Sequence, residues 1–341
     1  MLDVSVVIPT RNRRDRVRAL LGMLARSTHP LREVLVIDSS DADQKLTAAD
    51  LAPFASLSVR YVEAPRSVCI QRNLGIAAAS SPWIFLCDDD YEVPADYVER
   101  LAAHAAAHPE AGAVSGLHLE GADDGDGWRA QFPESSDFAL VWKYVFKLAL
   151  WGELRPHGRL ARAVAARVAT EGNHVAKSGW PVIVAMGGPF FRVPVYGLGA
   201  SLVKRDWLLA SPFDETLDSH GLGDNYGVAI GFPPEGIHIV TSAPIRHQKA
   251  SENRLASDTA AERRLLALHY FIRTRPPLAA RGVSTPWFMW SLVGAAALHG
   301  AAGHVGMARA FGRAFWQVVR GRNPYLDGRG AAVLESRDAR A

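Results

Sequence analysis

The chain has 341 residues, of which 48% are hydrophobic, so it can bury one large core, or one core with an appendage. Its formal charge of +3 is unevenly distributed: residues 246–341 hold 15 Lys or Arg against 6 Asp or Glu, a surplus of 9, which leaves −6 for residues 1–245. An acidic body with a basic tail argues against a uniform nucleic-acid-binding protein, so we expect no nucleic-acid partner.

Cysteine usage and hydropathy predict a cytoplasmic protein. The two cysteines, Cys69 and Cys87, show no CxxC spacing, which argues against a disulfide framework or a zinc site and fits a reducing compartment. The N-terminal stretch MLDVSVVIPTRN turns polar after six apolar-rich positions, so we expect no leader peptide. The apolar stretch at residues 287–303 is short and rich in glycine, so we expect no membrane-spanning helix.

The first 120 residues alternate between strand and helix patterns. The strand patterns are VSVVIP, EVLVID, LSVRYVEA, WIFLC and AGAVSGLHL. Between them, the spacing of apolar residues predicts helices over 14–27, 67–80 and 94–108. This alternation predicts βαβ units, and therefore an α/β fold with a mostly parallel sheet flanked by helices.

The rest of the chain is less regular. Residues 121–136 are rich in Gly and Asp and predict a mobile loop, and residues 137–151 are apolar nearly all round. A basic helix pattern covers residues 159–169, and short strands and turns follow it. From about Arg254 the sequence predicts basic helices to the end.

Polar and acidic residues follow several strand patterns at the point where each strand ends. Residues 10–12 (TRN) follow the first strand, Asp38 follows the second, and residues 88–90 (DDD) follow WIFLC. Open parallel sheets bind ligands outside the carboxyl ends of their strands. We therefore expect these side chains at the rim of one ligand cleft.

The acidic triplet at residues 88–90 suits a divalent cation. Mg²⁺ and Mn²⁺ take oxygen ligands, usually one or two carboxylates together with phosphate oxygens of the substrate. The alternative is a solvated acidic turn before a helix, where Asp suits the helix dipole. The position at a strand's carboxyl end favours the metal site.

Four motifs occur together in the order and spacing of one family. VSVVIPTRNR, VLVIDSSD, CIQRNLGI and WIFLCDDDYEVP resemble those of family 2 glycosyltransferases, and FDETLDSHGLGDNYGVAIGF at residues 213–232 is similar to that family's acceptor-side segment. The resemblance covers about residues 3–250. It implies a GT-A domain at residues 1–250, with a Rossmann-like nucleotide-sugar-binding half at 1–120 and an acceptor half at 121–250. Residues 251–341 would form a basic helical C-terminal extension.

The resemblance also implies which residues bind the nucleotide sugar. They are Pro9, Thr10, Arg11, Asp38, Arg72, Asn73, Asp88 and Asp89. The first three would line the base and ribose, Asp38 would accept a hydrogen bond from the base, and Arg72 with Asn73 would border the sugar nucleotide. An unpaired carboxylate would be costly at the end of a buried strand, as at Asp38. Arg72 alternatively pairs on a helix surface.

The metal ligands and the general base come from the same resemblance. Asp88 and Asp90 match the two acids of the DxD motif, and His247 in IRHQK resembles a histidine that contacts metal or diphosphate, so the three would hold Mg²⁺ or Mn²⁺. His247 alternatively is a structural histidine. Asp224 aligns with the second acid of a Glu-Asp pair, which is the family's usual general base.

This chain departs from the family pattern beside Asp224. The Glu of the pair is replaced by Gly223, and DNYGVA lacks a second Asp that many relatives have after the pair. Asp218 and His220, a few residues upstream, therefore stay open as alternative bases.

The resemblance implies a metal-dependent inverting transferase of the hexosyltransferase type. It would move a sugar from a nucleoside-diphosphate sugar to a saccharide or lipid-linked acceptor, in cell-surface polysaccharide or glycolipid synthesis. One alternative, a sugar nucleotidyltransferase, would carry a Gly-rich loop after the first strand, and PTRNRRDR has no Gly. A nicotinamide dehydrogenase lacks its GxGxxG there for the same reason. The other alternative is a non-catalytic, membrane-associated GT-A protein, against which the retained acids argue.

The tail carries its own signal. In a helix over residues 307–320, Arg309, Arg313 and Arg320 fall within about 40° of one another. The apolar residues on the opposite side are Met307, Phe311, Phe315 and Val318. Such a helix suits an anionic membrane surface, where each basic residue contributes about 1 kcal/mol. We therefore expect a peripheral protein at the inner face of the cell membrane. The alternative is that these helices pack on the catalytic domain or on a second subunit.

Overall fold

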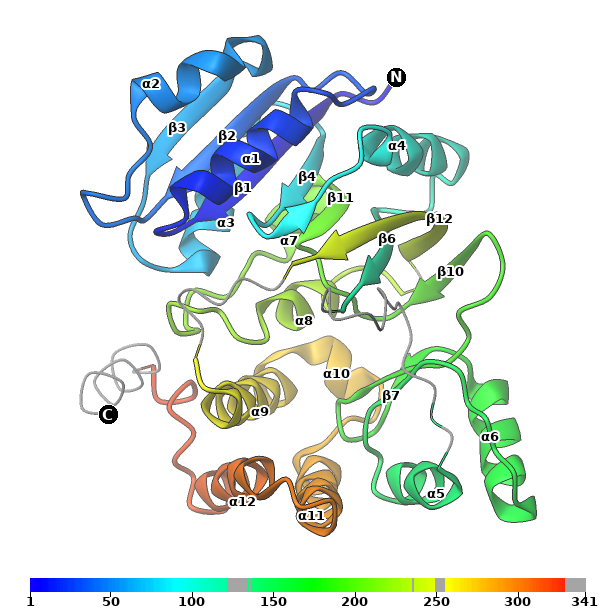
Figure 1. Cartoon of the computed structure of the whole chain (residues 1–341). Helices are drawn as coiled ribbons and strands as arrows, with labels where there is room; N and C mark the ends of the chain where they lie inside the picture. Colours follow the sequence, from blue (N-terminus) through cyan, green and yellow to red (C-terminus); the bar gives the residue numbers. More distant parts are fainter. Residues whose placement is uncertain (122–133, 135, 235, 249–254, 329–341) are drawn as a thin grey trace.

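The structure is a computed structural model that describes residues 1–121, 134, 136–234, 236–248 and 255–328 (Figure 1). Most of the predicted loop at 121–136, the predicted boundary at residues 250 and 251, and the end of the tail lie outside the described residues.

A nine-stranded sheet forms the centre of the molecule. Its order is β10-β12-β6-β11-β4-β1-β2-β3, and β5 pairs with β12. The strands are β1 (Val4–Thr10), β2 (Glu33–Asp38), β3 (Val59–Glu63), β4 (Trp83–Cys87), β5 (Tyr91–Glu92), β6 (Ala113–Leu119), β10 (Phe190–Val193), β11 (Ala200–Lys204) and β12 (Ile237–His247).

Strand direction brings the carboxyl ends of six strands to one edge. β1 is parallel to β2 and β4, β2 is parallel to β3, and Thr10 lies opposite Asp38 in the register. β11 is antiparallel to both β4 and β6, so β6 runs in the same direction as β4, and β12 is parallel to β6. The predicted, mostly parallel sheet is confirmed, with β5, β10 and β11 as antiparallel members that the sequence did not reveal.

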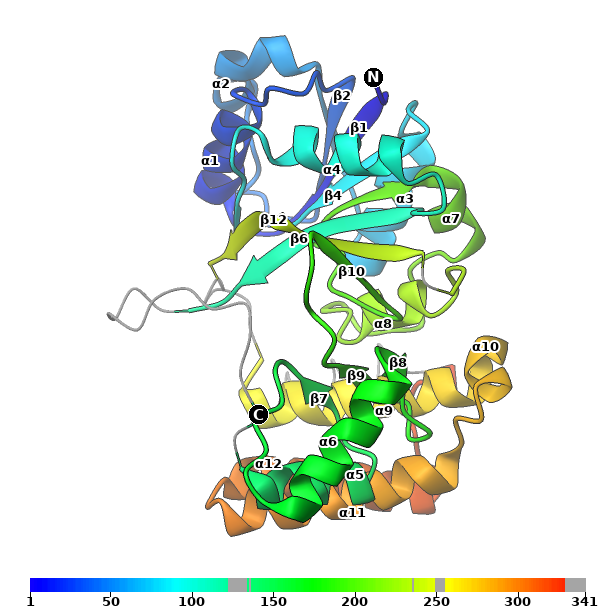
Figure 2. The ribbon, with the colours of Figure 1, turned by 90° about the vertical axis from the view of Figure 1, so that its right-hand side faces the viewer.

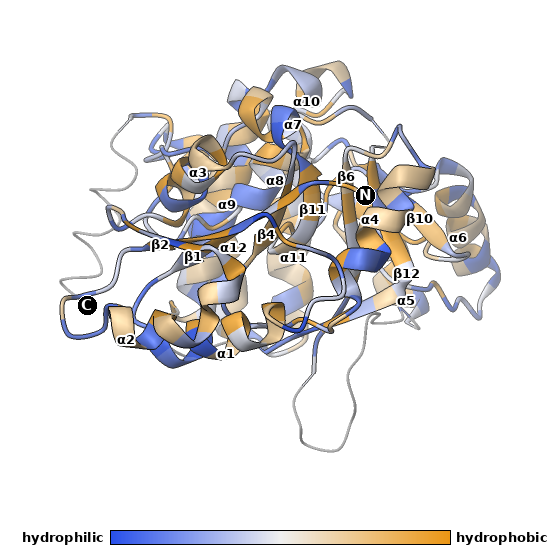
Figure 3. Ribbon diagram, turned by 90° about the horizontal axis from the view of Figure 1, so that it is seen from above, coloured by the Kyte–Doolittle hydropathy of each residue, from blue (hydrophilic) through white to orange (hydrophobic). Residues whose placement is uncertain are grey.

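Both faces of the sheet are covered by helices, which explains the continuous apolar strand patterns. Val6 and Ile8 pack with α1 (Arg14–Leu24) and α4 (Tyr97–Ala107), whereas Val7 packs in the cluster on the other face, which includes α3 (Val68–Ala78). α7 (Arg205–Ala210) and α8 (Asp224–Ala229) lie on this second face. β4 and β11 are mostly orange in Figure 3, as expected for buried strands.

A helical layer lies below the sheet and α8 (Figures 1 and 2). It contains α9 (Ser257–Thr274), α10 (Pro276–Ala280), α11 (Thr285–Ala301) and α12 (Val305–Val319). Phe271, Phe288 and Phe311 of these helices belong to the same hydrophobic cluster as Val7 of β1. The C-terminal helices therefore share a core with the sheet.

The apolar side of α12 faces inward. Phe311 is buried, and Phe315 packs partly buried against the same cluster. On the basic side, Arg313 donates a hydrogen bond to Glu262 of α9 at 2.5 Å. This arrangement is the packing on the rest of the chain that the alternative interpretation of the tail predicts. In the described part of the chain, no helix has the length and apolar character needed to cross a membrane.

Smaller elements complete the fold. A second sheet has the order β7-β9-β8. Its strands and the remaining helices are β7 (Leu150–Trp151), β8 (His174–Val175), β9 (Pro181–Ile183), α2 (Ala48–Leu51), a 3-10 helix (Ala52–Leu57), α5 (Asp137–Val145) and α6 (Arg159–Glu171). Cys69 and Cys87 are free and buried.

Candidate active site

A cavity of about 1090 Å³ opens at the carboxyl edge of the sheet. It lies between the ends of the strands and α9, so residues far apart in sequence line it together. The predicted site residues that line it are Pro9, Thr10, Arg11, Arg72, Asp88, Asp89, Asp90, Asp224 and His247.

Two predicted residues do not line this cavity. Asp38 is buried at the end of β2, where its carboxylate accepts hydrogen bonds from the Ser40 N–H at 2.7 Å and the Tyr61 hydroxyl at 2.8 Å. Asn73 of α3 exchanges hydrogen bonds with the backbone of Phe213. Both side chains therefore have structural partners, and their contacts to a nucleotide stay predictions.

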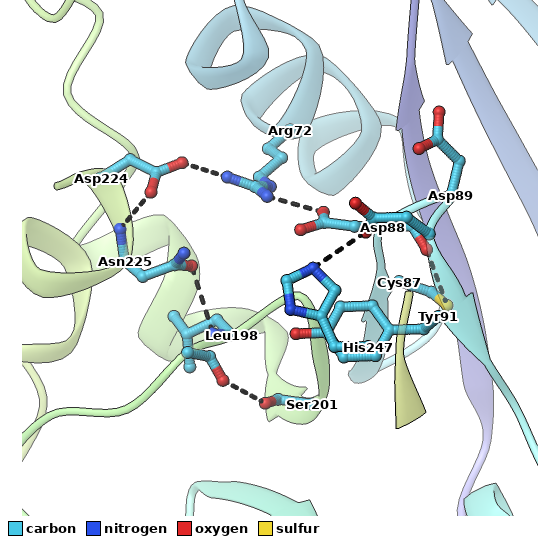
Figure 4. Close-up of polar contacts among 12 residues, drawn as sticks. Arg72, Cys87, Asp88, Asp89, Tyr91, Leu198, Ser201, Asp224, Asn225 and His247 are labelled. Atoms are coloured by element: carbon cyan, nitrogen blue, oxygen red, sulfur yellow. Dashed lines mark hydrogen bonds and ion pairs between the residues drawn. The ribbon is translucent and has the colours of Figure 1, made fainter. Parts of the chain in front are cut away.

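Arg72 connects the two sides of the site. Its guanidinium donates one hydrogen bond to Asp88 Oδ1 at 2.6 Å and another to Asp224 Oδ2 (Figure 4). The guanidinium also lies over the Phe213 ring. Burial alone would lower the pKa of Arg72, but the carboxylates of Asp88 and Asp224 raise it above its ordinary value. The alternative of a pair on a helix surface does not hold, because Arg72 is 4% exposed.

Asp89 points to the β1 side of the triplet. It accepts hydrogen bonds from the Thr10 hydroxyl at 2.7 Å and from Arg13 at 2.6 Å. Burial raises the pKa of Asp89 to about 6, although Arg13 and Thr10 act in the opposite direction. Asp89 therefore holds the loop after β1 against the loop after β4, and Arg13 is a partner that the sequence reading missed.

Asp90 and His247 form a pair at the other end of the triplet. His247 Nε2 lies 3.2 Å from Asp90 Oδ1, and Nδ1 lies 3.8 Å from Glu120. The Tyr91 ring stacks on the imidazole at 4.5 Å (Figure 4). Burial would lower the pKa of His247, but the carboxylates of Asp90 and Glu120 raise it to about 9.

Backbone geometry leaves space for Asp88. The Asp88 N–H donates to the carbonyl oxygen of Gly199 at 2.7 Å. A Cβ atom at Gly199 would lie 2.3 Å from Asp88 Oδ2. Only glycine allows the start of β11 to approach the carboxylate this closely.

Asp224 is the first residue of α8 and is 6% exposed. Its second oxygen accepts a hydrogen bond from the Asn225 N–H at 2.6 Å. Burial raises the pKa of Asp224 above its usual range, against the lowering effect of Arg72. The preceding Gly223 has φ +97°, a left-handed conformation that a Glu would adopt only with strain, which is a physical reason for the departure from the family pattern.

The two alternative bases differ in their surroundings. Asp218 is 0% exposed and does not line the cavity; it accepts hydrogen bonds from Arg263 at 2.9 Å and from the Tyr325 hydroxyl at 3.2 Å. His220 lines the cavity beside Asp224. Asp218 thus orders the loop before α8, while His220 and Asp224 are the groups that a substrate would meet.

α9 forms the other wall of the cavity. Leu268 and Phe271 are buried apolar residues of this wall, and Arg264 is exposed. Met307 of α12 also lines the cavity. No motif in the sequence points to these residues, because only the packing of the C-terminal helices brings them to the sheet edge.

Comparison with solved structures shows the fold. The structure of S. aureus TarS 1–349 in complex with UDP-GlcNAc covers 94% of this chain and 93% of its own, with a TM-score of 0.50 and 13% identity. That level of identity concerns the fold alone, and the fold is GT-A, as the sequence predicts.

Sequence comparison supports the predicted resemblance. Residues 5–162 match the model of Glycosyl transferase family 2, as the motifs in the sequence predict. The chain is similar to validoxylamine A glucosyltransferase of Streptomyces hygroscopicus subsp. jinggangensis (strain 5008), with 34% identity over 111 residues. It is also similar to the uncharacterized glycosyltransferase YwdF of Bacillus subtilis (strain 168), with 28% identity over 101 residues. These matches cover 31% and 30% of this chain, but only 26% and 37% of the two relatives.

Proposed function

We propose that the chain is a glycosyltransferase that moves a sugar from a nucleoside-diphosphate sugar to an acceptor hydroxyl with inversion. The observation that carries the proposal is the bridge from Asp88 through Arg72 to Asp224 inside one cavity. The Arg72 guanidinium thereby holds Asp88, on the proposed donor side, next to Asp224, on the proposed acceptor side. The bound UDP-GlcNAc of TarS, a protein of the same fold, supports a nucleotide sugar as donor.

Asp224 acts as general base in this proposal. The acceptor oxygen forms a bond to the anomeric carbon, and its proton passes to the Asp224 carboxylate. The bond from the anomeric carbon to the diphosphate breaks, and its electron pair leaves with the diphosphate. Attack opposite the leaving group inverts the anomeric centre. Burial raises the pKa of Asp224, which makes its carboxylate a stronger proton acceptor.

The residues at the sheet edge fit a divalent metal ion. Asp88 and Asp90 offer hard carboxylate oxygens, and the carboxylate of Glu120 beside His247 Nδ1 orients the imidazole, as carboxylates do around metal-binding histidines. A Mg²⁺ or Mn²⁺ ion held by Asp88, Asp90 and, once its ring has released a proton, His247 would neutralise charge on the departing diphosphate. Pro9, Thr10, Arg11, Asp89 and, behind them, Asp38 and Asn73 would hold or support the nucleotide.

Release of nucleoside diphosphate from a panel of sugar donors, with and without Mn²⁺, tests the proposal. We expect release that depends on both a donor and an acceptor and that increases with Mn²⁺. Formation of a nucleoside-diphosphate sugar from a nucleoside triphosphate and a sugar 1-phosphate, with release of pyrophosphate, would instead identify a sugar nucleotidyltransferase. Donor binding without turnover over a wide acceptor panel would identify a non-catalytic GT-A protein.

We also propose a saccharide or lipid-linked acceptor of cell-surface polysaccharide or glycolipid synthesis, used at the inner face of the cell membrane. Leu268 of α9 and the partly buried Met307 of α12 give this side of the cavity an apolar surface that suits a lipid-linked substrate. In this proposal residues 1–120 bind the donor, residues 121–250 receive the acceptor, and residues 251–341 contact the anionic membrane. Because the apolar side of α12 packs inward, the contact would use Trp287 and Trp316, which are 37% and 55% exposed.

Co-sedimentation with anionic vesicles tests the membrane contact. We expect the Trp287→Ala, Trp316→Ala double variant to bind less than the parent, since exposed tryptophans anchor proteins at membrane interfaces. Leu160→Ala on α6 is the matched control, because this side chain is 66% exposed and lies outside the tail. Equal binding by all three proteins, or no binding at low salt, would contradict the proposed membrane contact.

A further inference from the structure

Three histidines meet at the edge of the sheet opposite the cavity. His104 and His108 are four residues apart at the end of α4, so they share one helix face, and His238 is the second residue of β12. One nitrogen from each of the three imidazoles lies within 4.8 Å of the other two, and His104 Nε2 is 3.0 Å from His238 Nδ1. The sequence shows no metal-binding motif at this cluster, because folding brings together histidines from distant parts of the chain.

Two of the imidazoles are shielded from solvent. His238 is 0% exposed, and His104 is partly buried against it. The three rings therefore offer their nitrogen atoms to one shared space, and a metal ion there would take the nitrogen lone pair of each uncharged imidazole.

The surroundings resemble the outer shell of a metal site. His108 Nδ1 lies 3.3 Å from Glu110 Oε1, and a carboxylate on one ring nitrogen leaves the other to face a metal. The Phe190 ring stacks on His238 at 4.9 Å and packs edge-on against His104 at 4.8 Å, which gives the cluster an apolar wall. Arg192 also lies 3.5 Å from this Glu110 oxygen, so the positive charge of Arg192 is balanced by the Glu110 carboxylate.

The cluster is separate from the proposed donor site. His238 and His247 lie near opposite ends of β12, and nine residues of strand span roughly 30 Å at about 3.3 Å per residue. His247 has carboxylate neighbours, whereas the cluster has imidazole neighbours. The two sites therefore favour different ions, because carboxylates suit Mg²⁺ and Mn²⁺, and imidazoles suit Zn²⁺, Ni²⁺ and Cu²⁺.

We propose that His104, His108 and His238 bind one Zn²⁺ or a similar transition-metal ion, with water as the fourth ligand. Ligands at about 2.0–2.1 Å from Zn²⁺ lie about 3.4 Å apart, so the partly exposed His108 side chain turns inward when the ion binds. The ion connects the end of α4 to the start of β12, and it stabilises this edge of the sheet without taking part in sugar transfer.

Titration calorimetry of the untagged full chain, dialysed against a chelator and kept in excess Mn²⁺, tests the proposal. We expect one Zn²⁺ per chain that Mn²⁺ does not displace, and a Tm that rises with Zn²⁺ concentration. Co²⁺ in place of Zn²⁺ should give the visible absorption of a four-coordinate site. Absence of Zn²⁺ binding to the folded parent would overturn the proposal.

Variants assign the ion to the cluster. We expect His108→Ala and His104→Gln each to weaken Zn²⁺ binding at least 100-fold. His174→Ala is the matched control for His108→Ala, because both side chains are 31% exposed and both lie beside a glutamate. Asp90→Asn should leave Zn²⁺ binding unchanged. Loss of the ion in Asp90→Asn, or its retention in both cluster variants, would overturn the proposal.

Discussion

The two walls of the cavity carry different kinds of side chain. The wall formed by the sheet edge and α8 carries the acids Asp88, Asp90 and Asp224, each in contact with a cationic or hydrogen-bonding partner. The wall from α9 carries the buried Leu268 and Phe271 together with the exposed Arg264. The acids are thus concentrated on one side of the cavity, and the other side is mostly apolar.

This difference fits a division of work between the walls. Charged groups are costly to bury unless they are paired, so the polar wall needs Arg72 and His247 to keep its carboxylates in place. An apolar wall needs no such partners and accepts varied apolar groups by contact alone. We infer that the sheet edge determines the chemistry, and α9 determines which acceptors fit.

The largest effect is expected at the polar wall. Asp224→Asn should lower kcat by about 10²–10⁴-fold, because a positioned proton acceptor contributes about that much. Donor affinity, measured by calorimetry with nucleoside diphosphate, should stay near that of the parent.

Asp218→Asn serves as the comparison for Asp224→Asn. Since Asp218 is buried with Arg263 and Tyr325, its change should lower Tm as well as activity. Near-normal turnover in Asp224→Asn would contradict its role as general base and would indicate His220, which also lines the cavity, as the base.

Asp90→Asn should lower Mn²⁺-dependent turnover by about 10²–10³-fold, because the metal ion that neutralises the departing diphosphate would lose a ligand. Removing one electrostatic contact to a departing group usually costs about this much. A Mn²⁺ titration of nucleoside diphosphate release measures this change. Asp15→Asn is the control, because this side chain is 93% exposed and lies on α1. If metal affinity and turnover survive in Asp90→Asn, the acidic triplet has a structural role; it is not the solvated turn of the alternative interpretation, because Asp89 and Asp90 are buried.

Phe271→Ala tests the apolar wall. Removing this fully buried ring should lower the free energy of unfolding by about 3–5 kcal/mol, measured in urea. The ring also contacts α8, since a Cβ at Gly227 would lie 2.4 Å from Phe271. Phe138→Ala, at a side chain that is 63% exposed, should change stability far less. Equal effects of the two changes would contradict a shared core between α9 and the sheet.

The smallest effect concerns a buried carboxylate outside the cavity. Burial would raise the pKa of Glu33, but hydrogen bonds from Ser80, Arg60 and Ser5 lower it to about 2. A carboxyl group with a lowered pKa in the folded state stabilises the protein above its unfolded pKa of about 4.5, and this contribution is lost as the pH falls towards 2.

Glu33→Gln should therefore lower the free energy of unfolding by about 2 kcal/mol at pH 7, and the difference from the parent should shrink between pH 4.5 and pH 2. Urea unfolding at several pH values measures it. A difference that grows at acid pH would mean that the hydrogen bonds do not favour the ionised form of Glu33.

Much of the sheet could be predicted from local sequence. The runs VSVVIP, EVLVID and WIFLC form β1, β2 and β4, because buried parallel strands are continuous and apolar. The antiparallel insertion of β11 between β4 and β6 could not be predicted, since ASLVK has the same apolar character as a parallel strand. Strand direction depends on long-range pairing, which no local pattern encodes.

The same limit applies to the site. The acids after β4 could be predicted because they directly follow a strand, and nine predicted residues line the cavity. Asp38 has the same sequence position after β2, yet Tyr61 and Ser40 occupy its oxygens. The α9 wall had no sequence signal, because helix packing across the whole chain creates it. The roles of the individual residues, and the division of the chain at residue 250, stay predictions.

The hydrogen bond from Tyr325 to Asp218 has a consequence for synthesis of the protein. Tyr325 is made 107 residues after Asp218, which takes about 5–20 s at ordinary rates of translation. Until then, Asp218 in the loop before Asp224 lacks its hydrogen bond from Tyr325, and by that time every strand of the central sheet has left the ribosome's catalytic centre. We expect the growing chain to fold its donor-binding half first and to become able to react only when translation is nearly finished.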